Sequence, residues 1–123
     1  MKPFLKWAGG KYRLVERIKS SLPQKKRLIE PFVGSGALFL NTDYSNYLLA
    51  DSNPDLIHLY QILQKEGPVF IDYCNKFFIA ENNTELNFYL LREKFNTTRS
   101  KRKKAALFVY LNKHCFNGLC RYN

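Results

Sequence analysis

The stretch EPFVGSGALFL, residues 30–40, places two glycines in a G-x-G spacing between an apolar run and a helical pattern. Residues 27–32 form a short apolar run closed by a proline, which is typical of a buried strand. Gly34 and Gly36 allow a sharp turn and let a ligand approach the amides at a helix start. The stretch therefore predicts a strand, a ligand-binding turn and a helix.

A second buried-strand pattern, residues 46–51, ends in Asp51, fifteen residues after Gly36. An acid at this point of an α/β unit commonly binds ribose hydroxyls. Glu30 would repel a pyrophosphate and attract an ammonium or sulfonium group. A dinucleotide fingerprint needs a glycine where Phe39 stands. The pattern therefore favours S-adenosylmethionine over a dinucleotide, and the alternative is a tight turn in which Asp51 only caps the next helix.

Helical periodicity covers most of the remaining chain, and Ser52 or Asn53 can cap a helix that starts at Pro54. Residues 97–104, TTRSKRKK, are interpreted as a polar, basic joint. Helices are expected over residues 11–21, from 54 onward, and over 68–79, 85–95 and 105–114. Their buried faces are expected to hold Leu14, Val15, Ile18, Leu56, Leu59, Tyr60, Leu63, Val69, Tyr73, Phe77, Leu86, Leu90, Phe95, Leu107, Tyr110 and Leu111.

The order strand, glycine turn, helix, strand, helix is the first half of a doubly wound α/β unit with a parallel sheet. Only two convincing strand patterns occur in 123 residues. Two parallel strands do not make a stable sheet with helices on both faces. We therefore expect an α/β chain with an incomplete sheet and at most one complete domain.

Basic residues gather at the two ends of the chain, which carries twenty Lys and Arg against ten Asp and Glu. Residues 1–29 hold nine basic groups and one acid, and residues 94–123 hold eight basic groups and no acid. This segregation favours a surface that faces a polyanion. The alternative is a solvated surface of uneven charge.

The sequence argues against several classes of protein: membrane-spanning, secreted, disulfide-stabilised and zinc-binding. The longest apolar runs, such as residues 107–111, are too short to span a membrane, and the N-terminus lacks a signal-peptide pattern, so we expect a cytosolic protein. The odd number of cysteines argues against a disulfide scaffold. His114, Cys115 and Cys120 lack zinc-site spacing and a fourth ligand, so we expect no metal.

The two ends of the chain hold further candidate contacts. FLKWAGGK, residues 4–11, offers Trp7 as an aromatic wall and Lys11 as a carboxylate partner for a small cationic ligand, although a lone tryptophan is as often core. HCFNGLCRYN, residues 114–123, combines aromatic residues, an Asn-Gly pair and one arginine with no acidic group, which we interpret as the start of a DNA-reading segment. The alternative is an Asn-Gly turn with a core phenylalanine.

Four motifs in order, FLKWAGGK, EPFVGSGALFLN, LLADSNPDLI and FVYLNKHCFNGLCRYN, strongly resemble the Dam-type DNA adenine methyltransferases, including GATC-specific members. The resemblance covers residues 4–123. It implies the doubly wound, Rossmann-like S-adenosylmethionine-dependent methyltransferase fold. It also implies methyl transfer to adenine N6 in double-stranded DNA, with GATC as the expected site.

The resemblance assigns roles residue by residue. We expect residues 1–66 to form the S-adenosylmethionine-binding part of the catalytic domain, and residues 67–123 to form a helical segment and the start of the target-recognition domain. Contacts to S-adenosylmethionine are expected from Trp7, Lys11, Glu30, Phe32, Gly34, Gly36 and Asp51. Contacts to DNA are expected from Phe116, Asn117, Leu119 and Arg121, with the phenylalanine as a wedge and the arginine on a guanine.

The family's catalytic D-P-P-Y motif does not occur in the 123 residues. We therefore expect no catalytic residue here, and we interpret the sequence as an N-terminal portion that is inactive by itself. The alternatives are a non-catalytic module that binds S-adenosylmethionine or DNA and, less well supported, a dinucleotide-dependent enzyme. The full-length form is expected to be a cytoplasmic monomer of bacterial or phage origin, associated with the nucleoid.

Overall fold

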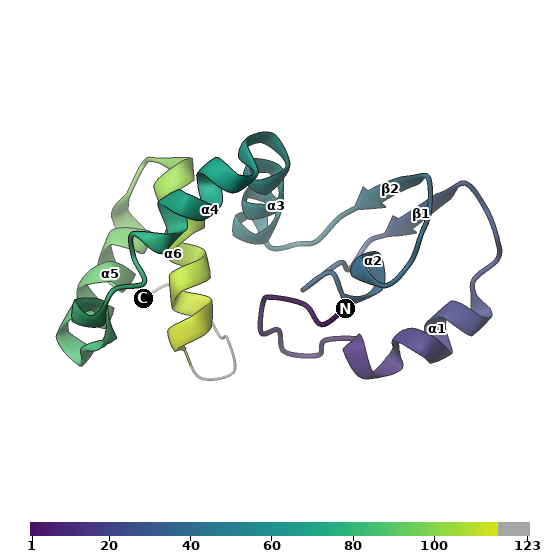
Figure 1. Ribbon diagram of the computed structural model, residues 1–123, viewed down its shortest axis with the longest axis horizontal. Coiled ribbons are helices and arrows are strands. Elements are labelled where there is room, and N and C mark those ends of the chain that lie inside the picture. The colour runs from purple at the N-terminus through teal and green to yellow at the C-terminus, as the bar shows by residue number, and fades with distance from the viewer. Residues whose placement is uncertain (116–123) are drawn as a thin grey trace. The chain divides into compact units, whose positions relative to one another are not determined.

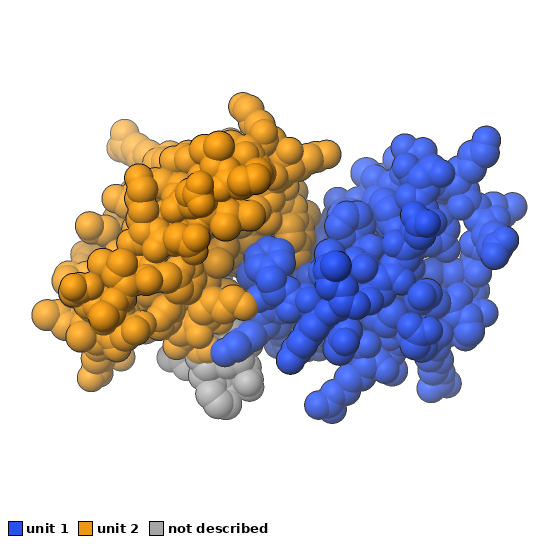
Figure 2. Space-filling view, viewed as in Figure 1, with its two compact units in different colours: residues 1–52 blue, residues 53–123 orange. Residues whose placement is uncertain are grey.

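The chain forms two compact units, residues 1–52 and residues 53–123 (Figures 1 and 2). The computed structural model describes residues 1–115. We call these the first unit and the second unit. The sequence predicts a boundary between residues 66 and 67, which separates the S-adenosylmethionine-binding part from the target-recognition part. This boundary differs from the boundary between the compact units, and it stays a prediction.

The first unit is built around two parallel strands, β1 (Arg27–Glu30) and β2 (Asn46–Leu49). Each residue of β1 has a register partner in β2, from Arg27 with Asn46 to Glu30 with Leu49. In residues 1–115 these strands pair only with each other. The two predicted strands and their parallel pairing in a small sheet are therefore confirmed, and the incompleteness of the sheet stays a prediction.

Helical segments precede and connect the strands of the first unit (Figure 1). A 3-10 turn, η1 (Tyr12–Leu14), runs into α1 (Val15–Ser21), so the expected helix at residues 11–21 is present. The short helix α2 (Ala37–Leu40) follows the glycine turn. The buried apolar residues of this unit are Leu5, Val15, Leu28, Val33, Ala37 and Leu38.

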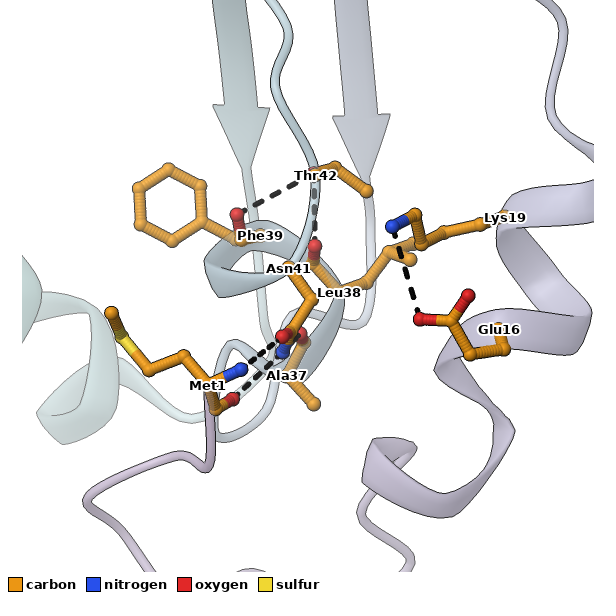
Figure 3. Close-up of polar contacts among 8 residues, drawn as sticks. All are labelled: Met1, Glu16, Lys19, Ala37, Leu38, Phe39, Asn41 and Thr42. Carbon is orange, nitrogen blue, oxygen red and sulfur yellow. Dashed lines mark hydrogen bonds and ion pairs between the residues drawn. The ribbon is translucent and has the colours of Figure 1, made fainter.

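The first residue of the chain is held against the end of α2 (Figure 3). The Asn41 side-chain amide donates to the Met1 carbonyl at 2.7 Å and to the Ala37 carbonyl at 2.8 Å, while the Met1 ammonium donates to Asn41 Oδ1. Thr42 Oγ1 donates to the Leu38 carbonyl at 2.9 Å, which satisfies another carbonyl at this helix end. These bonds tie the N-terminal segment to the helix that follows the glycine turn.

The second unit is helical in its described part, and α6 (Lys101–His114) lies at its centre. α6 packs against α3 (Pro54–Glu66), α4 (Pro68–Asn75) and α5 (Glu85–Thr97), and η2 (Ala80–Asn83) leads into α5. The residues of α6 from 105 to 108 and from 110 to 112 are all buried. No helix in residues 1–115 is both long and apolar enough to cross a bilayer.

Side-chain caps explain where three of these helices begin. Asn53 Oδ1 accepts from the Asp55 and Leu56 amides at 3.0 and 3.2 Å, which confirms one of the two predicted caps of α3. Thr84 caps α5 and Ser100 caps α6 in the same way. The cap at Ser100 corrects the expected basic joint, because residues 101–104 form the first turn of α6.

The expected buried faces of α4 and α5 are partly wrong. Val69 is 62% exposed and Leu86 is 70% exposed. The buried residues of these two helices are Phe70, Cys74, Leu91 and Phe95, of which only Phe95 was expected. Both helices carry apolar side chains on more than one face, and packing within the unit selects which face is covered. In α3 the expected Leu56 and Leu59 are fully buried.

Candidate functional site

The first unit contains a hollow of about 220 Å³ around the glycine turn. Three short segments form it: residues 7–11, residues 32–37 and Asp51 at the end of β2. We call it the glycine-loop hollow. Its lining residues are Trp7, Ala8, Gly9, Gly10, Lys11, Phe32, Val33, Gly34, Ser35, Ala37 and Asp51.

Close approach to Trp7 explains the glycine at position 34. Gly34 has a left-handed φ of +52°, and a Cβ there would lie 3.0 Å from Trp7 Cδ1 and 3.1 Å from Trp7 Nε1. Gly36 also has a positive φ, of +78°, and it is the N-cap residue of α2. Its amide donates to the Val33 carbonyl at 2.9 Å, which closes the turn. The turn therefore brings its backbone directly against the indole edge.

Asp51 fastens the glycine turn to β2. Its Oδ2 accepts a hydrogen bond from the Gly34 amide at 3.0 Å. The backbone ladder continues beside it, because the Val33 amide donates to the Ala50 carbonyl at 2.8 Å. A carboxylate that follows one strand and an amide that follows the other thus meet on the wall of the hollow.

Lys11 joins the N-terminal segment to the end of β1. Its Nζ donates to the Phe32 carbonyl and lies 3.9 Å from Glu30 Oε2. Glu30 is only 4% exposed, and neither of its carboxylate oxygens accepts a hydrogen bond of standard geometry from the described residues. Burial raises the pKa of Glu30, while the Lys11 ammonium acts to lower it. The lysine therefore supplies charge compensation for this buried carboxyl group.

The structure brings together five of the seven residues predicted to contact a cofactor: Trp7, Lys11, Phe32, Gly34 and Asp51 all line the hollow. Glu30 pairs with Lys11 instead of lining the wall, and Gly36 begins α2. The roles of all seven toward a cofactor stay predictions. The predicted DNA contacts Phe116, Asn117, Leu119 and Arg121 lie outside the described residues.

Sequence reasoning missed part of the wall, formed by Ala8, Gly9, Gly10, Val33, Ser35 and Ala37. The Gly-Gly pair was an available signal, since the Gly10 amide donates to the Trp7 carbonyl at 3.2 Å and Gly9 has a φ of +70°. A turn at this pair directs the chain from Trp7 to Lys11 along the hollow. Ala8, Val33 and Ala37 carry no polar side-chain group that could have marked them.

Two cations of the basic run at residues 101–104 are engaged inside the second unit. Arg102 Nε lies 2.8 Å from Glu66 Oε1, and its guanidinium lies 4.0 Å from the centre of the Tyr73 ring. Lys104 Nζ lies 3.7 Å from Asp55 Oδ1. These contacts link α6 to α3 and α4. They leave less of this run available to bind phosphates than its sequence suggests.

Titratable side chains do not cluster as metal ligands in the part of the chain that the structure describes. In residues 1–115 no group of three or more His, Cys, Asp or Glu side chains is placed to hold an ion. Cys74 is buried and Cys115 is half-buried.

Comparison with known proteins identifies close relatives. The family model for "D12 class N6 adenine-specific DNA methyltransferase" matches residues 7–123. A DNA adenine methylase of Serratia marcescens is 56% identical over 120 residues, covering 98% of this chain and 44% of the relative. The DNA adenine methylases of Salmonella typhi and Escherichia coli K12 are 51% and 49% identical, and the chain covers 43% of each. The chain thus spans less than half the length of these curated relatives.

Proposed function

The chain belongs to the D12 class N6 adenine-specific DNA methyltransferase family, and from that premise we propose that its first unit binds S-adenosylmethionine for methyl transfer to adenine N6 in double-stranded DNA. We assign it the N-terminal part of a doubly wound methyltransferase fold. The observation that carries the proposal is the convergence of Trp7, Lys11, Phe32, Gly34 and Asp51 on one hollow.

The chemistry of the hollow suits this cofactor. It offers an aromatic ring, a carboxylate and an ammonium group beside a tight glycine turn. Sites for drug-sized ligands usually have volumes of about 300–1,000 Å³, so a ligand of that size would contact the lining of this hollow of about 220 Å³ and extend beyond it. When bound, S-adenosylmethionine supplies an electrophilic methyl group on a sulfonium.

Three of the lining residues have assigned roles in this proposal. The indole of Trp7 stacks beside the adenine ring of the cofactor, and the Asp51 carboxylate accepts hydrogen bonds from the ribose hydroxyls. Lys11, held by Glu30 and the Phe32 carbonyl, places its ammonium near the carboxylate of the methionine portion. Glu30 therefore acts by positioning Lys11.

The DNA-facing part of the proposal rests on the family resemblance. Phe116 is assigned as the aromatic wedge, and Arg121 as the residue that contacts guanine. Asn117 and Leu119 flank them, within a target-recognition segment that begins in residues 67–123. The expected site is GATC, and Lys and Arg supply the contacts to phosphate.

The family's D-P-P-Y motif is absent from the 123 residues, so we assign no catalytic residue to this chain. The same observation favours a second candidate, a non-catalytic module that binds S-adenosylmethionine or DNA. The curated relatives come from bacteria. We therefore propose action in the cytoplasm, at the nucleoid, with the full-length form as a monomer.

A methyl-transfer assay separates the two candidates. The 123-residue chain is tested alone and after fusion to the part of the Serratia marcescens relative that the match leaves out. Labelled methyl incorporation is measured on a GATC duplex and on a duplex with one substituted base. We expect transfer to GATC by the fusion and none by the chain alone. A fusion that is inactive, or whose rate is unchanged by Asp51→Ala, contradicts the proposed enzyme.

A further inference from the structure

The last turn of α6 is bound to η2 through two side chains. The Tyr110 hydroxyl donates to the Asn82 carbonyl at 2.6 Å, and His114 Nε2 lies 3.0 Å from Asn83 Oδ1. These partners are 28 and 31 residues apart in the sequence, and all four belong to the second unit. We call this pair of contacts the α6–η2 clamp. It holds the end of the helix against a neighbouring segment of the same unit.

The His114 ring is held at both of its nitrogens and on one face. Nδ1 lies 2.8 Å from the Tyr110 carbonyl, and because a carbonyl oxygen only accepts, Nδ1 is the donor. The ring also stacks on the Tyr110 ring, with centroids 4.1 Å apart and planes inclined by 28°. The Asn83 amide can offer either an acceptor or a donor to Nε2. Contacts on three sides therefore determine the orientation of the ring.

η2 is itself connected to the helices on either side of it in the sequence. The Asn82 side-chain amide donates at 2.9 Å to the carbonyl of Phe77, two residues after α4. The Asn87 side-chain amide, from the first turn of α5, donates to the Glu81 carbonyl at 2.8 Å. A contact with η2 therefore locates the end of α6 relative to both α4 and α5.

The clamp lies where the chain leaves α6 toward the predicted DNA contacts. His114 is the last residue of α6, and Cys115 has an extended backbone with a ψ of 152°. The predicted wedge Phe116 follows His114 by two residues, and the predicted guanine contact Arg121 follows it by seven. Binding groups act well only when they are held within about 0.5 Å of their productive positions. A fixed end of α6 would give these contacts a defined starting point.

We propose that His114 is a positioning residue for base reading, which acts by fixing the point where the chain leaves α6. The inference rests on the proposed function. A histidine beside DNA can also bind a phosphate through a free ring nitrogen. In His114 both nitrogens already face protein oxygens, those of the Tyr110 carbonyl and the Asn83 side chain. The geometry therefore favours positioning over phosphate binding.

Replacing Asn83 tests this role, because Asn83 is exposed and its loss leaves the His114 ring in place. The variant Asn83→Ala is made in the fusion with the unmatched part of the Serratia marcescens relative. kcat/KM is measured on a GATC duplex and on a duplex with one substituted base. We expect the ratio of the two values to fall about three- to tenfold, the effect of one lost hydrogen bond. His114→Ala should lower the ratio at least as much, and the double variant no further than His114→Ala alone.

Two more variants separate positioning from a general loss of stability. Asn83→Asp keeps an acceptor oxygen for Nε2 and should retain the wild-type ratio within about twofold. Ser100→Ala removes the cap at the other end of α6, where Ser100 Oγ accepts from the Lys103 amide at 3.1 Å. It should lower the melting temperature of the fusion and keep the ratio within about twofold of wild type, because the contacts at the end of α6 remain.

Equal discrimination by wild type and Asn83→Ala overturns the inference. A loss of discrimination in Ser100→Ala as large as that in Asn83→Ala also overturns it, as does a loss that Asn83→Asp shares. A wild-type fusion that methylates both duplexes equally, or neither, contradicts the proposed function, and the inference falls with it. A wild-type fusion that discriminates while Asn83→Ala matches it contradicts this inference alone.

Discussion

Replacing Gly34 by alanine tests how the glycine turn fits against Trp7. The added methyl group would lie 3.0 Å from Trp7 Cδ1 at a backbone φ of +52°. A left-handed conformation costs a non-glycine residue about 1–2 kcal/mol, and overpacking typically adds about 1–3 kcal/mol. We therefore expect Gly34→Ala to lower the free energy of unfolding of the first unit by about 2–5 kcal/mol.

Gly9→Ala is the matched control for this experiment. Gly9 has a φ of +70°, but a Cβ there would meet nothing within 4 Å, so only the backbone cost of about 1–2 kcal/mol applies. In a Trp7→Ala background the cost of Gly34→Ala should fall to that of Gly9→Ala, because the crowded ring is gone.

Urea unfolding followed by far-UV circular dichroism measures all of these variants. Tryptophan fluorescence cannot follow the unfolding of the variants that carry Trp7→Ala, because Trp7 is the only tryptophan of the chain. The reasoning is refuted if Gly34→Ala and Gly9→Ala cost the same in the wild-type background. It is also refuted if the excess cost of Gly34→Ala persists after the indole is removed.

Three further predictions concern the second unit and Arg121, the proposed guanine contact. Arg102→Ala should lower the unfolding free energy of the second unit by about 1–2 kcal/mol, through loss of its ion pair and ring contact; thermal melts that match wild type would contradict this. Burial raises the pKa of Cys74 from 9.0 to about 11, so folding favours the protonated thiol. Its stabilising contribution is complete below pH 9 and is lost as pH rises through 11. Cys74→Ala should therefore flatten the decline of unfolding free energy in this alkaline window, and an unchanged slope would count against the assignment. In the complete enzyme Arg121→Ala should reduce discrimination at one base pair by about 1–3 kcal/mol, measured as relative methylation rates; equal slowing on every duplex would indicate a phosphate contact instead.

Features that depend on near neighbours could be predicted from the sequence. The strands lie inside the expected ranges, and α3 starts at the predicted cap Asn53 because its side chain accepts from amides only two and three residues away. The G-x-G turn and the acid at Asp51 indicated one site, and Gly34 of the turn lines the glycine-loop hollow together with Asp51. Each signal is local in the sequence, and the parallel pairing of β1 with β2 brings the glycine turn and Asp51 together.

Features set by tertiary packing could not be predicted. Val69 and Phe70 are adjacent apolar residues of α4, and only the packed unit shows that Phe70 is the buried one. Arg102 looked like part of an exposed run, because its partner Glu66 is thirty-six residues away in the sequence. Likewise, no pattern in β1 showed that Glu30 would be buried beside Lys11.

Titration of S-adenosylmethionine into the 123-residue chain is the most direct test that the glycine-loop hollow is a cofactor site. Isothermal titration calorimetry should show binding of S-adenosylmethionine and its homocysteine product, with no binding of NAD. Asp51→Ala should weaken that binding by about 2–4 kcal/mol, the range for removing a charged partner from buried hydroxyls. Nonspecific DNA affinity should stay unchanged. Binding of NAD in preference to S-adenosylmethionine, or cofactor affinity that Asp51→Ala leaves intact, would contradict the account.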